Sequence, residues 1–142
     1  MKRTKLHIVG HSTVSEQKVE IQSLVRSIVI IRDGGCILRK IRYCDDPVLQ
    51  ADHLITRSNS ATYADTRLIV CLCRSCHGWK FWHEKEYDAL VKSILPKDRV
   101  ELWDRCLKDS WMPVRTSSQD WKIHIIALKQ ELKSYEQLIP LQ

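Results

Sequence analysis

The cysteines of this chain include a pair with metal-binding spacing. Cys73 and Cys76 form a C-x2-C motif, and two thiolates at this spacing can bind one Zn²⁺ from a tight turn. A structural zinc ion needs four ligands, and Cys36 and Cys44, which lie next to turn-like sequence, are the upstream candidates for the other two. Their C-x7-C spacing is longer than that of a usual zinc knuckle. The alternative is that some of these cysteines are small buried hydrophobes.

A carboxylate and two imidazoles form a second chemical signal. Asp52 and His53 are neighbours on a predicted strand, and His77 directly follows the C-x2-C motif, where a helix is predicted to begin. Successive side chains of a strand point to opposite faces. Asp52 and His53 can therefore serve one site only if the strand is distorted or the site lies around its edge.

The hydrophobic pattern predicts the elements that must position these residues. Thr13 and Glu16 form a capping box before the first amphipathic helix, and Asp33-Gly34-Gly35 ends it. Strands and helices are distinguished by apolar periods of two and of three to four residues. The predicted elements are a strand over residues 6–9, a helix over 15–31, a hairpin of strands over 49–55 and 67–72, a helix starting near 73, and helices marked by apolar residues at 87–94 and at 100–107.

A final helix is predicted after a linker over residues 110–118, with Ser117 and Asp120 at its start. Its apolar seam is heptad-like but too short for a coiled coil. The seam either docks on the core of the same chain or forms a homodimer. The seam residues are Trp121, Ile125, Leu128, Leu132, Tyr135 and Ile139.

The remaining cysteines and a group of aromatic residues are assigned to the core. We assign Cys71 and Cys106 to packing. For the aromatic residues Trp79, Phe81 and Trp82 we favour a core role over base stacking.

Length and composition predict a single globular domain. The chain has 142 residues, with 28% charged and 44% hydrophobic residues, and no apolar run approaches the length that spans a bilayer. No apolar stretch of the signal-peptide type follows the basic start, so we expect a cytoplasmic protein whose six cysteines stay reduced. The net charge of +6 lies entirely in residues 1–80, which carry 13 Lys and Arg against 7 Asp and Glu. This asymmetry favours either a polyanionic partner or a solvated basic surface.

The order of these motifs resembles the HNH family of endonucleases, which is built on the ββα-metal fold. Residues 49–57 (LQADHLITR) and 68–77 (LIVCLCRSCH) carry the resemblance, which extends over about Cys36 to Trp82, a third of the chain. The sequence is similar to small phage-encoded members that have a four-cysteine zinc site. The resemblance implies an α+β protein with a ββα-metal core over residues 32–95, an N-terminal strand and helix extension over 1–31 and a C-terminal helical extension over 96–142.

The resemblance also implies a role for each residue. His53 would be the general base that activates water, and Asp52 and His77 would bind a catalytic Mg²⁺ or Mn²⁺. Zinc at the four cysteines would be structural. The substrate would be DNA, double-stranded by expectation. Further candidates are phosphate contacts at Arg57, Arg67, Arg74 and Lys80, and an auxiliary metal or phosphate contact at His83.

One position departs from the family pattern. The middle Asn of the motif, about nine residues before the final His, is Leu68 here. A main-chain carbonyl near Leu68, or the side chain of Asn59 or Asp65, would have to orient His53 instead. The sequence-based hypothesis is that Leu68→Asn leaves activity equal or raises it.

The sequence thus predicts a metal-dependent DNA endonuclease. One alternative is a zinc-stabilised nucleic-acid-binding module that lost catalysis. Another is a structure-specific nuclease for branched DNA that dimerises through its final helix.

Overall fold

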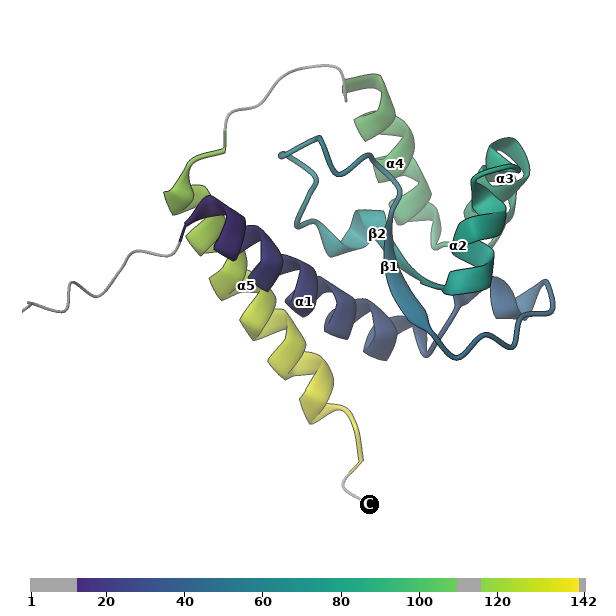
Figure 1. The fold of residues 1–142 in the computed structure, drawn as a ribbon, viewed down its shortest axis with the longest axis horizontal. Helices are drawn as coiled ribbons and strands as arrows, with labels where there is room; N and C mark the ends of the chain where they lie inside the picture. Colours follow the sequence, from purple (N-terminus) through teal and green to yellow (C-terminus); the bar gives the residue numbers. More distant parts are fainter. Residues whose placement is uncertain (1–12, 110–115, 141–142) are drawn as a thin grey trace, which may run out of the picture.

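The chain folds as an α+β structure around one small sheet. The computed structural model describes residues 13–109 and 116–140, which contain five α-helices and a two-stranded antiparallel sheet (Figure 1). The predicted strand over residues 6–9, and residues 110–115 of the predicted linker, lie outside the described residues. The elements are α1 (Val14–Asp33), β1 (Leu49–His53), β2 (Ile69–Cys73), α2 (Arg74–Lys80), α3 (Glu84–Ile94), α4 (Lys97–Asp109) and α5 (Ser118–Gln137), with 3₁₀ turns at Ile37–Lys40 and Thr66–Leu68.

Helix α1 begins and ends at the predicted signals. The Thr13 hydroxyl accepts a hydrogen bond from the Glu16 N–H, and the Glu16 carboxylate accepts one from the Thr13 N–H, which completes the capping box. Gly34 ends the helix with a φ of 68°, a left-handed conformation that glycine adopts without steric cost. This prediction is confirmed.

The predicted hairpin is also confirmed, with shifted boundaries. Asp52 pairs with Val70 and His53 pairs with Ile69 across the two antiparallel strands. β1 ends at His53 and β2 begins only at Ile69, because residues 66–68 form a 3₁₀ turn. The Leu54 N–H still donates to the Leu68 carbonyl at 2.9 Å, so the pairing continues one step beyond the strand end.

The sheet separates two hydrophobic clusters. Side chains of β2 alternate between them, with Val70 and Leu72 in one cluster and Ile69 and Cys71 in the other. The first cluster lies with α2, α3 and α4, and we call this side of the sheet the cysteine face. The second lies with α1 and α5, and we call it the helix face. Figure 1 shows the two groups of helices on either side of the hairpin.

Helix α5 packs on the core of its own chain. Trp121, Ile125 and Leu128 are buried in the cluster that α1 lines, and the Gln17 amide donates to the Ser118 carbonyl at 3.2 Å. The expectation that the seam docks on the core is confirmed for these three residues. A homodimer through α5 stays a prediction.

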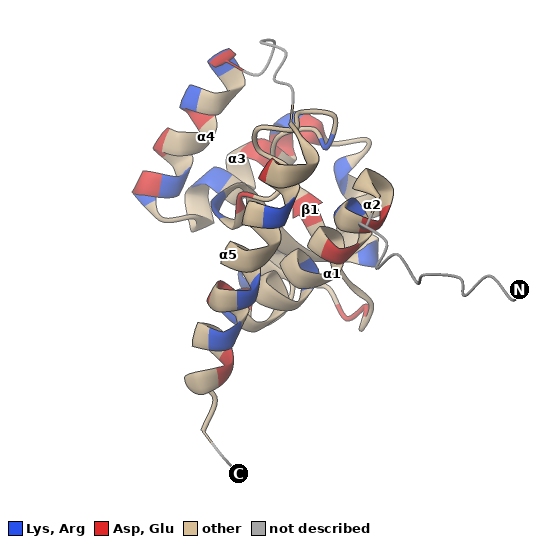
Figure 2. Ribbon diagram, turned by 90° about the vertical axis from the view of Figure 1, so that its left-hand side faces the viewer, with Lys and Arg blue, Asp and Glu red and all other residues tan. Residues whose placement is uncertain are grey.

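The C-terminal helices carry balanced charge. Figure 2 shows basic and acidic residues mixed along α4 and along the later part of α5. This matches the zero net charge of residues 81–142, which carry 10 Lys and Arg and 10 Asp and Glu. None of the helices within residues 13–109 and 116–140 combines the length and apolar character that crossing a bilayer demands.

Candidate metal centre and candidate active site

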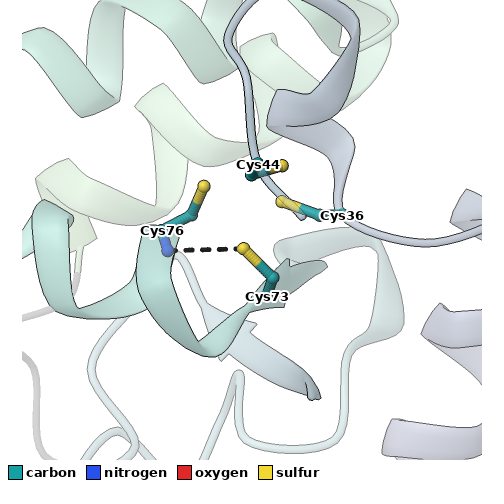
Figure 3. Close-up of side chains that lie close together, drawn as sticks. All are labelled: Cys36, Cys44, Cys73 and Cys76. Atoms are coloured by element: carbon teal, nitrogen blue, oxygen red, sulfur yellow. Dashed lines mark hydrogen bonds between the residues drawn. The ribbon is translucent and has the colours of Figure 1, made fainter. Parts of the chain in front are cut away.

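Four cysteines converge from two separate segments. Cys36 and Cys44 come from the connection between α1 and β1, whereas Cys73 ends β2 and Cys76 lies in the first turn of α2 (Figure 3). The four Sγ atoms all lie within 4.8 Å of one another. Ligands about 2.3 Å from a tetrahedral Zn²⁺ are separated by roughly 3.8 Å, so a small inward movement satisfies zinc geometry. The predicted four-cysteine group is confirmed as a cluster able to bind a metal such as zinc.

The local chain conformation favours the thiolate form of one of the four cysteines. The Cys76 N–H donates to the Cys73 Sγ at 3.4 Å, as Figure 3 shows. Burial opposes ionisation of Cys73, but this hydrogen bond and those from neighbouring thiols lower the Cys73 pKa overall. Burial raises the pKa of Cys44 and of Cys76. These two thiols therefore need a cation to become thiolates at neutral pH, which a bound metal ion supplies.

The remaining two cysteines are packing residues, as predicted. Cys71 is fully buried on the helix face, and burial raises its pKa to about 12. Cys106 is half-buried against the cysteine face.

Asp52 is the centre of a polar cluster on the cysteine face. Its side chain is 3% exposed, and the Lys80 ammonium contacts both carboxylate oxygens at 2.8 and 2.9 Å. The Tyr87 hydroxyl donates to Oδ2, and burial raises the Tyr87 pKa so that this donor keeps its proton. Nε2 of His77 lies 3.5 Å from Oδ1 of Asp52. The two predicted metal ligands are thus brought together.

The Asp52–His77 pair has metal-binding separation but already holds a cation. Two ligands at right angles about Mg²⁺, each about 2.1 Å from it, are about 3 Å apart, close to the 3.5 Å observed. The Lys80 ammonium, however, occupies both carboxylate oxygens. Asp52 and His77 fit a divalent ion only when Lys80 moves away.

His53 lies on the helix face, opposite Asp52. Its Nε2 is 3.0 Å from the Tyr63 carbonyl oxygen, and because a carbonyl only accepts, Nε2 carries the proton. Nδ1 is buried and has no hydrogen-bond partner within the described residues. Burial lowers the pKa of His53, which favours the neutral imidazole. The main-chain carbonyl predicted near Leu68 is therefore that of Tyr63, five residues upstream.

The other residues considered for orienting His53 have their own contacts. Asn59 Oδ1 accepts from the Ala61 N–H, and Asp65 binds both the main chain and the guanidinium of Arg67. Leu68 is 1% exposed and belongs to the hydrophobic cluster of the cysteine face. The position of the missing Asn is thus a core position in this chain.

Three of the four predicted phosphate contacts are paired with carboxylates. Lys80 binds Asp52, Arg67 binds Asp65 at 2.7 Å, and Arg74 contacts Asp46 at 3.2 Å. Arg57 is exposed and has no ion pair in the part of the chain that the structure describes.

The aromatic residues after α2 differ from expectation. Phe81 and Trp82 are 82% and 84% exposed, so the core interpretation is wrong for these two residues. Trp79 is half-buried and stacks on His83 with ring centroids 4.8 Å apart, and Nδ1 of His83 lies 3.0 Å from the Trp79 carbonyl. His83 is thus an exposed, stacked side chain at the start of α3.

Tyr63 and Tyr87 contact the candidate site residues His53 and Asp52, and the sequence did not reveal these contacts. Tyr87 was assigned to the apolar face of its helix, and its contact with Asp52 spans 35 residues. Tyr63 contacts His53 through its main-chain carbonyl, a group that every residue type has, so the sequence gives no sign of this contact. No local signal identifies either contact.

A scan against protein-family models finds no match for this chain, and searches of curated proteins and of solved structures find none either. The resemblance to HNH endonucleases therefore depends on the motif residues of the sequence alone.

Proposed function

We propose that this chain is a metal-dependent endonuclease of the HNH type that hydrolyses DNA phosphodiester bonds. The supporting architecture is a hairpin followed without a break by α2, with the cysteine cluster at their junction. Asp52 on β1 and His77 on α2 are then neighbours at the end of the hairpin. This proximity of Asp52 and His77 supports the proposal of a ββα-metal core.

The observation that carries the proposal is the state of the His53 imidazole. The Tyr63 carbonyl holds the proton on Nε2, so Nδ1 carries the free lone pair, and this buried atom would accept a proton from water once substrate binding opens a path to it. The lowered pKa keeps the ring neutral at neutral pH, as a general base must be. Most buried polar side-chain atoms have a hydrogen-bond partner, so an unpaired Nδ1 is uncommon for a histidine with a purely structural role.

Asp52 and His77 would hold the catalytic divalent ion, which when bound supplies positive charge near the leaving oxygen. Asp52 and His53 leave β1 on opposite faces, but His53 is the last residue of the strand. The substrate phosphate would therefore lie around the strand end, between the two side chains. Tyr87 fixes the orientation of the Asp52 carboxylate.

Plasmid nicking with Mg²⁺ or Mn²⁺ tests the proposal. His53→Ala should lower the cleavage rate by about 10²-fold or more, the usual contribution of a general base. His124→Ala is the matched control, because His124 lies on α5, where its ring contacts Trp121, and it is not among the residues that line the cavity beside His53. Equal cleavage by the wild type and His53→Ala, with both folded, would contradict the proposal.

A second candidate function is a zinc-stabilised nucleic-acid-binding module without catalysis. The Lys80–Asp52 ion pair favours it, because an internal ammonium already neutralises the carboxylate. This candidate predicts salt-sensitive DNA binding with no cleavage under any divalent ion. His53-dependent nicking would exclude it.

A further inference from the structure

A cavity lies beside His53 on the helix face of the sheet. Its volume is about 160 Å³, roughly five water molecules at their liquid volume. Helix α1, β1 and the loop after β1 all contribute to its wall. Because α1 lies outside the stretch that resembles HNH proteins, the motif residues do not anticipate this cavity.

The charges around the cavity are of one sign. Arg26 and Arg57 line it, and no carboxylate does. The Arg26 guanidinium donates through Nε and Nη2 to the Leu49 carbonyl at 3.2 and 3.1 Å, which fixes it at the cavity wall. Arg57 is the predicted phosphate contact that has no carboxylate partner among the described residues, and its charge lies close enough to His53 to lower the His53 pKa further. Two guanidinium groups without a carboxylate partner among the described residues favour an anion.

The rest of the wall suits the sugar that carries the phosphate. The side chains of Ile21, Val25 and Tyr63 supply apolar surface, and Gln22 and Gln50 supply amide groups that can donate and accept hydrogen bonds. A small inorganic anion would leave this apolar surface unused. A phosphate joined to a sugar uses both kinds of wall.

We propose that this cavity binds a nucleotide phosphate of the nucleic-acid strand, held by Arg57 and Arg26, with the attached sugar against α1. The inference rests on the proposed function, because it adds a second phosphate site on the helix face to the substrate phosphate at the end of β1. It makes α1 part of the nucleic-acid interface. The same chemistry is offered by a free mononucleotide and by a strand.

Binding measurements without added Mg²⁺ or Mn²⁺ test the cavity separately from catalysis. The probes are a fluorescein-labelled single-stranded oligothymidylate, followed by anisotropy, and thymidine 5′-monophosphate, thymidine and inorganic phosphate, followed by calorimetry. Arg57→Gln should weaken oligothymidylate binding about tenfold, the scale of a charge-assisted hydrogen bond. Arg105→Gln, an exposed arginine on α4 away from the cavity, should change it less than twofold.

A blocking variant tests the position without removing charge. Gln22 is exposed on α1 at the cavity wall, so Gln22→Trp should fill the cavity and weaken binding about tenfold while the protein stays folded. Ser23→Trp is the control, because Ser23 is an exposed neighbour that does not line the cavity. Binding of the monophosphate but not of thymidine identifies the phosphate as the recognised group, and tighter binding of the oligomer identifies a strand as its source.

Wild-type binding by both Arg57→Gln and Gln22→Trp would overturn the inference, whether or not the protein cleaves DNA. Inorganic phosphate that binds as well as thymidine 5′-monophosphate would overturn it as well. If both variants lose binding but His53→Ala cleaves like the wild type, the cavity assignment stands and the proposed catalytic role fails.

Discussion

The cysteine face and the helix face of the hairpin are built in different ways. On the cysteine face, four thiols and a buried carboxylate lie among the apolar residues, and burial raises the pKa of two of these thiols, Cys44 and Cys76. On the helix face, α1 and α5 bury large apolar side chains such as Ile21 and Trp121. We therefore expect the cysteine face to depend on a bound metal as well as on the apolar area removed from water, and the helix face on that area alone. A two-stranded sheet alone is only marginally stable, so both faces are required.

Metal removal should cause the largest difference in hydrogen-exchange protection between the two faces. We expect one zinc per chain by elemental analysis, and loss of the metal to abolish the protection of α2 in hydrogen exchange, because binding of structural zinc contributes on the order of 10 kcal/mol to folding. Helices α1 and α5 should keep more of their protection. Cys76→Ser should reproduce the effect of a chelator.

The control for that experiment is Cys106→Ser, a half-buried cysteine outside the four-cysteine cluster. It should retain the zinc. A metal-free protein with unchanged exchange on the cysteine face would show that the four thiols are packing residues.

Leu68→Asn should have the next largest effect, on the stability of the cysteine face. The side chain is 1% exposed, and replacing it removes buried apolar volume and adds an amide without a partner. We expect the free energy of unfolding to fall by about 3 kcal/mol in denaturant titration, on the scale of large core substitutions. Leu68→Met, a nearly volume-conserving change, should cost less than about 1.5 kcal/mol.

This expectation qualifies the sequence-based hypothesis that Leu68→Asn maintains or raises activity. That hypothesis has to be measured at a temperature where the variant is folded. An unchanged midpoint of unfolding would mean that the Asn side chain finds polar partners at this position.

Lys80→Met should increase the affinity of the cysteine face for Mn²⁺. The Lys80 ammonium and a divalent ion compete for the same two oxygens of Asp52, so its removal should strengthen Mn²⁺ binding about tenfold, the scale of one charge-assisted hydrogen bond. Electron paramagnetic resonance of bound Mn²⁺ provides a readout independent of cleavage. Lys92→Met, which breaks the exposed pair with Asp104, is the control. Equal Mn²⁺ affinity in all three proteins would show that Asp52 is not a metal ligand.

The smallest expected effect concerns the start of α5 on the helix face. Hydrogen bonds from the Ser117 hydroxyl and N–H lower the pKa of Asp120, so this contribution to stability is present above the unfolded pKa of about 3.9 and is lost as the pH falls through the lower folded value. Hydrogen exchange in the first turn of α5 should therefore increase at acid pH. Asp120→Ala should show that faster exchange already at neutral pH, and identical exchange in the two proteins would contradict the role of the cap.

The parts of the molecule that the sequence predicts are those with local signals. The capping boxes at Thr13 and Ser117, the hairpin and the C-x2-C motif each depend on residues within a few positions of one another. The convergence of Cys36 and Cys44 with that motif was inferred from ligand number, and the structure bears it out.

Contacts between distant segments could not be predicted in the same way. Lys80 was expected on phosphate and instead binds Asp52, 28 residues away, because a buried carboxylate needs a counter-ion. Phe81 and Trp82 were expected in the core and are exposed, because α2 ends at Lys80 and both residues lie in the connection before α3 starts at Glu84. Their hydrophobic character carried no information about where the helix would stop.

Successive side chains of β1 point to opposite faces of the sheet, so the order of Asp52 and His53 decides which face each side chain occupies. Exchanging Asp52 and His53 would leave composition and charge unchanged, yet the parity of the strand would send a carboxylate toward Tyr63 and an imidazole toward Lys80 and Tyr87. A single-residue insertion within β1 would have the same consequence. The connection between the strands, which is polar and partly exposed, is where changes of length are better tolerated.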